Sequence, residues 1–320
     1  MKNIVLIYSH IMNLQMADQN LKKCFGEIRK LVPKQVEFAI GSLISAMMFE
    51  IQRNGASGVP LKNVHMLIDF TKKYMNRVYT ENALELFTEQ IDMDTIELLQ
   101  NKGHSISSLA SEKKRKQVLE ELKVDQNEVD TINQFYQGLP VFKIESTKAY
   151  VEGHDNIEEG DFVRVKVKIT LVNSEEPLVV DNILRKSFIY PGEDSIIPKT
   201  PFLYLFMTDK SGNLQGFDKI PFIKFVNEDD GTIQKSVIHT SVLSFGVEGD
   251  KKINIKVMND SFLTENKGLD EAITIKVLPK SEPVEEIDND DQESIEGSEG
   301  DSRQDYSDEE LEEEPDKKND

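Results

Sequence analysis

The spacing of apolar residues along this chain changes once, near Gly138-Leu139-Pro140. Before that point, apolar residues recur every three to four positions, which is typical of amphipathic helices. After it, they alternate with polar residues, which is typical of half-buried antiparallel strands. The sequence therefore predicts an α+β multidomain protein, with its helices first and its strands second.

The helical half is predicted to form a bundle over residues 1–92 and a smaller helical unit over residues 93–138. Its clearest helix is Val36–Ile51, which Asn54-Gly55 and Gly58 end. A second helix follows Pro60, since a proline suits the first turn, where its missing N–H costs nothing. Shorter helices are predicted at residues 82–87, 94–100, 112–122 and 128–136.

The second half, residues 139–280, is predicted to be a β-sandwich of immunoglobulin or fibronectin type III style. About seven short strands without a helix between them are the pattern of such a sandwich. The predicted strands are residues 141–151, 161–172, 202–208, 220–226, 236–245, 253–257 and 273–277. Residues 173–200 are interpreted as a long loop or insertion.

Residues 281–320 are an acidic tail that carries most of the net charge. The tail holds 19 acidic and three basic residues, a net of −16, whereas the whole chain has a net charge of −20. With few apolar side chains it cannot offset the entropy of ordering, so it is predicted to be disordered. Two interpretations stay open: a solubility tail, or a binding segment for a basic partner, whose affinity would fall as salt rises.

The binding interpretation names candidate residues within the tail. The acidic candidates for a basic partner are Asp308, Glu309, Glu310, Glu312, Glu313 and Glu314. Ser298, Ser302 and Ser307 each have an acidic residue three positions on and are candidate phosphorylation sites. Each phosphate would add about −1.5 to −2 charges, which would strengthen binding to a basic segment. The alternative is that composition alone places acids beside these serines.

No catalytic, cofactor-binding or metal-binding signature occurs in the sequence. It contains no glycine-rich phosphate loop, no Gly-x-Ser-x-Gly and no His-Glu-x-x-His. Cys24 is the one cysteine, which rules out an intrachain disulfide and favours a reducing compartment. The protein is therefore predicted not to be an enzyme and to need neither a cofactor nor a metal. Its longest apolar stretch is too short for a bilayer, so the chain is expected to be soluble.

Nucleic-acid binding is a weaker hypothesis. Residues 94–122 faintly resemble a helix-hairpin-helix module, which contacts phosphates through backbone amides, and Lys113-Lys114-Arg115-Lys116 lie within them. The module's second glycine is absent, and the first 280 residues are not basic, which disfavours a phosphate-driven interface. The alternative is that the basic run is a solvated helix face.

Several short stretches, in their order along the chain, carry a family resemblance. They are Ile4–His10, Ile106–Leu109, Gly138-Leu139-Pro140, Ile157–Asp161 and Asn259–Leu263. Together with the order of bundle, helical unit, sandwich and acidic tail, they resemble the C-terminal cytosolic part of the Sec-sixty-three family. That family serves the protein-conducting channel of the endoplasmic reticulum. Its tryptophan pair has no counterpart here, where Pro201–Tyr204 stand.

The resemblance implies a non-catalytic subunit of the translocation machinery at the cytosolic face of the endoplasmic reticulum membrane. The sandwich would dock on the channel, the Sec-sixty-one complex, and the acidic tail would bind a basic Sec-sixty-two-like partner. Membrane association would come through partners or through a region outside this sequence. The alternative is a scaffold module of a DExH RNA helicase or RNA-processing complex, where the same three-part unit follows the motor domains. A generic soluble adaptor is a third hypothesis.

Overall fold

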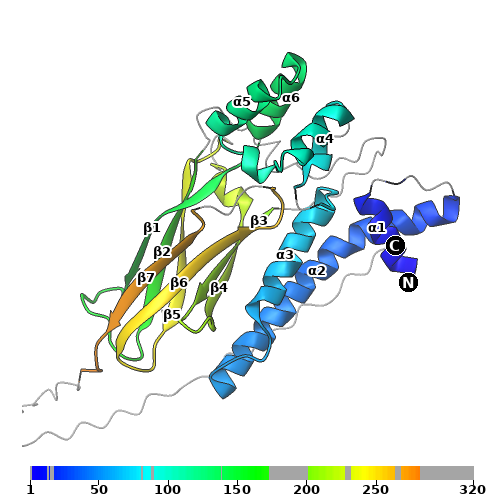
Figure 1. Ribbon diagram of the computed structural model, residues 1–320. Helices are drawn as coiled ribbons and strands as arrows, with labels where there is room; N and C mark the ends of the chain where they lie inside the picture. The colour runs from blue at the N-terminus through cyan, green and yellow to red at the C-terminus, as the bar shows by residue number, and fades with distance from the viewer. Residues whose placement is uncertain are drawn as a thin grey trace, which may run out of the picture. The chain divides into compact units, whose positions relative to one another are not determined.

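The computed structural model of the chain describes residues 2–12, 14, 18–80, 82–87, 90–137, 139–172, 201–227, 232–263 and 268–281 (Figure 1). Met1–Ser281 group into one unit by their contacts. Within it, helices occupy the first half of the chain and two antiparallel sheets follow, which confirms the predicted class. The finer division into domains at residues 92, 138 and 280 stays a prediction.

The helices and strands follow the predicted order. The α-helices are α1 (Lys2–Ile11), α2 (Gln19–Asn54), α3 (Leu61–Met75), α4 (Met93–Asn101), α5 (Glu112–Glu121) and α6 (Gln126–Gln137). Short 3-10 helices are η1 (Leu84–Phe87), η2 (Ser107–Leu109) and η3 (Phe222–Phe225). The strands are β1 (Phe142–Tyr150), β2 (Phe162–Leu171), β3 (Phe202–Thr208), β4 (Leu214–Pro221), β5 (Ser236–Ser244), β6 (Gly249–Asn259) and β7 (Asp270–Val277).

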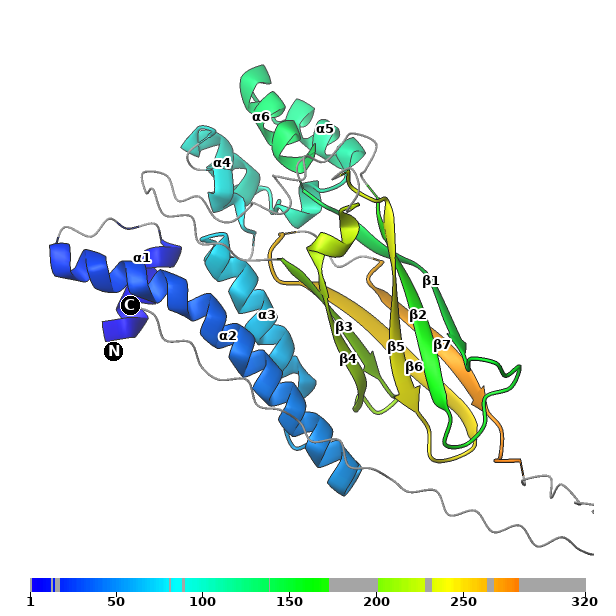
Figure 2. The same ribbon diagram turned by 180° about the vertical axis from the view of Figure 1, so that it is seen from behind.

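Helix α2 is much longer than the predicted Val36–Ile51. It begins after Asp18, whose carboxylate accepts a hydrogen bond from the Leu21 N–H at 2.9 Å, and ends at Gly55, which has a left-handed φ of 76°. Pro33 lies inside the helix. A proline removes one backbone hydrogen bond and pushes its ring against the preceding turn. This accounts for the bend in α2 that Figure 2 shows.

One predicted strand is wrong. Residues 220–226 were expected to form a strand, but β4 runs from Leu214 to Pro221 and Phe222–Phe225 turn into η3. Glycine weakens strands, so Gly216 makes this strand difficult to predict from residue propensities. A Cβ at Gly216 would lie 2.6 Å from Met207 Cε and 2.7 Å from Leu243 Cδ2, so a larger residue there would require the ends of these two side chains to move. The helix expected at residues 82–87 is the single 3-10 turn η1.

The strands form a three-stranded sheet in the order β1-β2-β5 and a four-stranded sheet in the order β4-β3-β6-β7. All neighbouring strands are antiparallel. Their inward side chains share one apolar core, which continues into buried residues of η1, α4, η2, α5 and α6. These helices gather at one end of the two sheets in both views (Figures 1 and 2).

A second apolar core lies between the helices α2 and α3 and the outer face of the four-stranded sheet. It contains Ile40, Ile44, Met47, Val64, Ile68, Tyr204, Phe206, Leu214 and Met258. Strand β3 serves both cores, with Leu203, Leu205 and Met207 in the first and Tyr204 and Phe206 in the second. A strand buried on both faces reads as a continuous apolar run, as Phe202–Met207 does.

Candidate functional site

The tail residues singled out in the sequence lie outside the described residues. They are Ser298, Ser302, Ser307, Asp308, Glu309, Glu310, Glu312, Glu313 and Glu314. Within the described ranges, His, Cys, Asp and Glu nowhere gather in a group of three that could hold a metal ion. In the same ranges, no helix is both long and apolar enough to cross a membrane.

The turn Asn259–Phe262, at the end of β6, is almost fully buried although three of its residues are polar. The Asp260 carboxylate, 1% exposed, accepts hydrogen bonds from the Phe202 N–H at 3.1 Å and the Ser261 hydroxyl at 2.6 Å. The Tyr204 hydroxyl donates to its other oxygen at 3.3 Å. A buried carboxylate is stable only with such partners. Burial first, and then the Asp260 charge, raise the pKa of Tyr204 well above its usual value.

A polar side chain at the C-terminal end of helix α3 holds the helix to this turn. The Asn76 amide donates to the Ser261 carbonyl oxygen at 2.8 Å. Lys72 is buried, and its ammonium lies 3.5 Å from the Asp69 carboxylate. Burial lowers the pKa of Lys72, and the charges of Asp69 and Asp260 oppose that shift. The turn therefore joins the helical pair to the sheet, and its role is structural.

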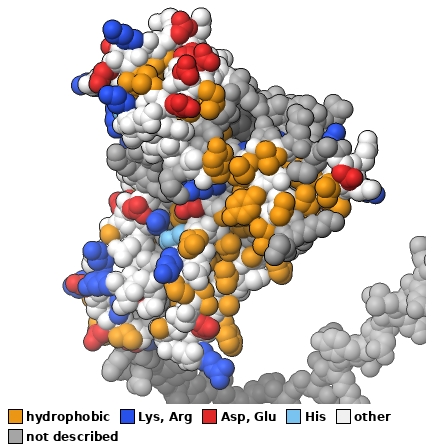
Figure 3. Space-filling view, turned by 45° about the vertical axis from the view of Figure 1, so that its right-hand side comes forward, with side chains coloured by type: hydrophobic (Ala, Val, Ile, Leu, Met, Phe, Trp, Pro, Cys, Tyr) orange, Lys and Arg blue, Asp and Glu red, His pale blue; other side chains and the backbone are white. Residues whose placement is uncertain are grey.

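An apolar stripe runs along the outside of α2. Leu31, Phe38 and Phe49 are 49%, 73% and 62% exposed. Their spacings of seven and eleven residues are about two and three helical turns, so the three side chains lie on one face. Figure 3 shows apolar side chains gathered over this helical part of the molecule. We call Leu31, Phe38 and Phe49 the α2 apolar stripe.

A hollow of about 400 Å³ lies beside Phe38. Aromatic side chains of the four-stranded sheet, Tyr204 and Phe217, form one wall, and Ile40 and Gly41 of α2 form another. Apolar surface that is exposed and gathered in one place is typical of protein or membrane interaction sites. This hollow and the α2 apolar stripe are suited to the apolar side chains of a protein partner.

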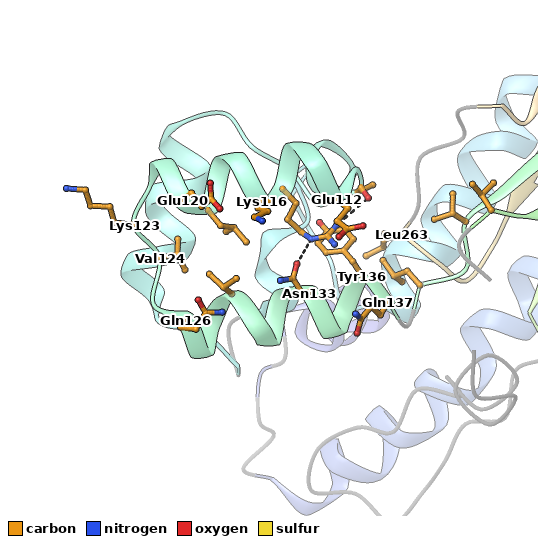
Figure 4. Close-up of a pocket in the computed structure, with 17 residues that line it drawn as sticks. Glu112, Lys116, Glu120, Lys123, Val124, Gln126, Asn133, Tyr136, Gln137 and Leu263 are labelled. Carbon is orange, nitrogen blue, oxygen red and sulfur yellow. Dashed lines mark hydrogen bonds between the residues drawn. The ribbon is translucent and has the colours of Figure 1, made fainter. Parts of the chain in front are cut away.

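A larger cavity of about 860 Å³ opens between α5 and α6. Figure 4 shows the side chains of the two helices turned toward one another across it. Its charged lining is mixed in sign: Glu112, Arg115, Lys116 and Glu120 of α5 and Lys123, which follows that helix. Charges of both signs side by side favour no particular ionic ligand.

Arg115 belongs to the packing beside this cavity and is only 5% exposed. Its Nε donates to Asn133 Oδ1 at 2.8 Å, and its Nη1 donates to the carbonyl oxygens of Leu109 and Ala110 at 3.0 and 3.3 Å. The guanidinium also lies 4.4 Å from the centre of the Tyr136 ring. Arg115 therefore joins α5, α6 and the turn before them.

The other members of the basic run, Lys113, Lys114 and Lys116, lie exposed on α5. Three residues of the basic run therefore lie on a solvated helix face, and the fourth, Arg115, packs in the interior. In place of the glycine hairpin of a helix-hairpin-helix module, Ser107–Leu109 form the 3-10 helix η2.

Asp218, His239 and Ser241 meet where the edges of the two sheets approach each other, at β4 and β5. His239 Nε2 lies 3.3 Å from Asp218 Oδ2, and the Ser241 hydroxyl donates to the same oxygen. The serine thus hydrogen-bonds to the carboxylate and not to the imidazole. A Ser-His-Asp triad requires the imidazole to accept the serine proton, so this geometry does not activate Ser241 as such a triad would.

Replacing Asp218 with asparagine is expected to flatten the acid limb of the stability curve. Burial alone would raise the pKa of Asp218, but contacts from His239 and Ser241 outweigh it and hold the pKa below the usual 3.8. The stability that this carboxylate contributes is therefore complete above its unfolded-state pKa and is lost as pH falls through the lower folded-state pKa. Urea unfolding at a series of pH values below about 5 measures this loss.

The matched control is Asp250→Asn, at an exposed position of β6. It should follow the unchanged protein at every pH. Equal acid sensitivity of the Asp218→Asn variant and the unchanged protein would show that Asp218 gains nothing from its two neighbours.

Comparisons with known proteins find only weak structural similarity. No family model matches the chain, and no curated protein matches it. Among solved structures, the chain is similar to the CARDB domain of a Pyrococcus furiosus protein in complex with di-metal ions, with 12% identity and a TM-score of 0.28. That match covers 45% of this chain and 97% of that chain. A solution structure of the same domain matches with 10% identity, a TM-score of 0.25, and coverage of 44% and 96%. A likeness at this level assigns no role to any residue of this chain.

Proposed function

We propose that this protein is a non-catalytic subunit of the endoplasmic-reticulum protein-translocation machinery. In this proposal its folded body docks on the cytosolic side of the protein-conducting channel, the Sec-sixty-one complex. The acidic tail binds a basic, Sec-sixty-two-like partner by charge attraction. The observation that carries the docking part is the α2 apolar stripe with the hollow beside it.

The sheet topology supports the finer fold assignment within this proposal, a sandwich of immunoglobulin or fibronectin type III style. The order β1-β2-β5 corresponds to strands A, B and E. The order β4-β3-β6-β7 corresponds to strands C, F and G with an added C′ strand at the edge. The buried turn Asn259–Phe262, which is one of the stretches that carry the family resemblance, joins this sandwich to α3.

Replacing Leu31 and Phe38 together with aspartate is expected to reduce recovery of channel subunits about tenfold or more, since each buried apolar anchor contributes about 1.5–3 kcal/mol. Because Phe38 is largely exposed and Leu31 is half-exposed, the free energy of unfolding should change by less than about 1 kcal/mol. The measurement is affinity purification from cells, with the recovered proteins identified and quantified.

Val247→Asp is the matched control, since this valine is 63% exposed but lies in the turn between β5 and β6. It should leave recovery unchanged. Recovery of RNA-processing components in place of channel subunits would contradict the proposal and favour the helicase-scaffold alternative.

A further inference from the structure

The outer face of the three-stranded sheet is positively charged, although the chain as a whole is strongly negative. Arg164, Lys166 and Lys168 occupy consecutive outward positions of β2, between the buried residues Val163, Val165 and Val167. On β1, Lys148 pairs directly with Lys166. We call Lys148, Arg164, Lys166 and Lys168 the basic sheet face.

Exposed apolar side chains accompany these charges. On β5, Ile238 lies opposite Lys168 and Val242 lies opposite Arg164, and both are more than half exposed. Phe162, the next outward residue of β2, is 75% exposed. The surface therefore offers a row of positive charges beside a row of apolar side chains.

The pair Lys148 and Lys166 works against the stability of the sheet. Like charges directly opposite each other on neighbouring strands repel and are destabilising. Arg164 and Lys168 have carboxylate partners, Glu152 and Glu145. No ion pair is recorded for Lys148 or Lys166 within the described residues, and Lys166 Nζ lies 4.7 Å from the centre of the Tyr150 ring. An anionic ligand would relieve this repulsion.

We propose that the basic sheet face binds an acidic peptide segment of a partner protein, extended along β2. Outward positions on one strand are about 6.6–6.8 Å apart, which is also the spacing of alternate side chains in an extended peptide. A segment with carboxylates at alternate positions therefore meets Arg164, Lys166 and Lys168 in turn. Its flanking apolar side chains contact Phe162, Ile238 and Val242.

The same surface is less suited to single-stranded RNA, which is held largely by successive bases that stack on aromatic rings. The Tyr150 ring already has Lys166 over its face, and Ile238 and Val242 are aliphatic, so Phe162 is left as the exposed ring beside the basic residues named above. The peptide site is also separate from the α2 apolar stripe, because α2 and α3 pack on the other sheet.

The test uses the full chain and a short labelled peptide with three glutamates at alternate positions and a leucine at each end. Fluorescence anisotropy should show binding that weakens as salt rises. Lys166→Glu should weaken binding about tenfold or more, the factor that corresponds to 1.4 kcal/mol. The melting temperature of this variant should stay the same or rise, because the new carboxylate would lie opposite Lys148.

Two controls separate this site from general charge attraction. The double variant Lys252→Glu and Lys276→Glu changes two exposed lysines of β6 and β7 on the other sheet, and it should bind the peptide normally. A second peptide of the same composition, with its glutamates adjacent to one another, should bind more weakly. Equal binding of the two peptides, an equal effect of the control variant, or tighter binding of an RNA oligonucleotide to this face would each overturn the proposal.

Discussion

Replacing Asp260 with alanine is expected to lower the free energy of unfolding by about 3–5 kcal/mol. The change leaves the Phe202 N–H and the hydroxyls of Tyr204 and Ser261 without the acceptor that they share. Each buried donor without a partner costs about 1–3 kcal/mol. Lys72, which is buried nearby, also loses a neighbouring negative charge. Urea unfolding followed by circular dichroism measures the effect.

Two further variants bracket this result. Tyr204→Phe removes one donor and keeps the carboxylate, so it should cost about 1 kcal/mol. Asp250→Ala, at an exposed position of β6, the strand that leads to Asp260, should change stability by less than about 0.5 kcal/mol. A loss below about 1 kcal/mol for Asp260→Ala would show that the Asp260 carboxylate does not stabilise the buried turn.

Replacing Arg115 with methionine is expected to cost about 2–4 kcal/mol. Methionine keeps much of the apolar length of the side chain but leaves the carbonyls of Leu109 and Ala110 and the Asn133 side chain without their donor. The contact with the Tyr136 ring is lost as well. Thermal and urea unfolding of the full chain measure the change.

Lys114→Met is the matched control, since this lysine is exposed on the same helix. It should have almost no effect on stability. If Arg115→Met unfolds normally but weakens binding of an RNA oligonucleotide, Arg115 is a phosphate contact and the packing role is wrong. A stability loss without a change in RNA binding supports packing.

The sequence predicts those elements in which apolar side chains recur at a regular spacing. Strand β3 was predicted with its observed limits, and Gly55 and Pro60 correctly marked the end of α2 and the start of α3. Two of the elements that were missed, wholly or in part, contain a residue that propensity opposes. The first turns of α2 precede Pro33, and β4 contains Gly216.

The candidate sites were predictable to a smaller extent. Polar residues are normally exposed, and nothing near Asn259–Ser261 in the sequence indicates that Phe202, Tyr204 and Asn76 surround them. The alternation of β2 does place Arg164, Lys166 and Lys168 on one face. The pairing of Lys166 with Lys148 depends on the strand register, which includes an irregularity between Ile144 and Ser146. The tail candidates stay predictions.

The double burial of β3 has a consequence for synthesis of the chain. Roughly 130 residues separate the end of α3 at Met75 from the start of β3 at Phe202. At typical elongation rates, the apolar faces of α2 and α3 therefore stay uncovered for about 10 s during translation, until β3 is synthesised. Over that interval the nascent chain presents Ile40, Met47 and Ile68 to its surroundings. We expect the chain to associate with chaperones that bind nascent polypeptides until β3 has been made.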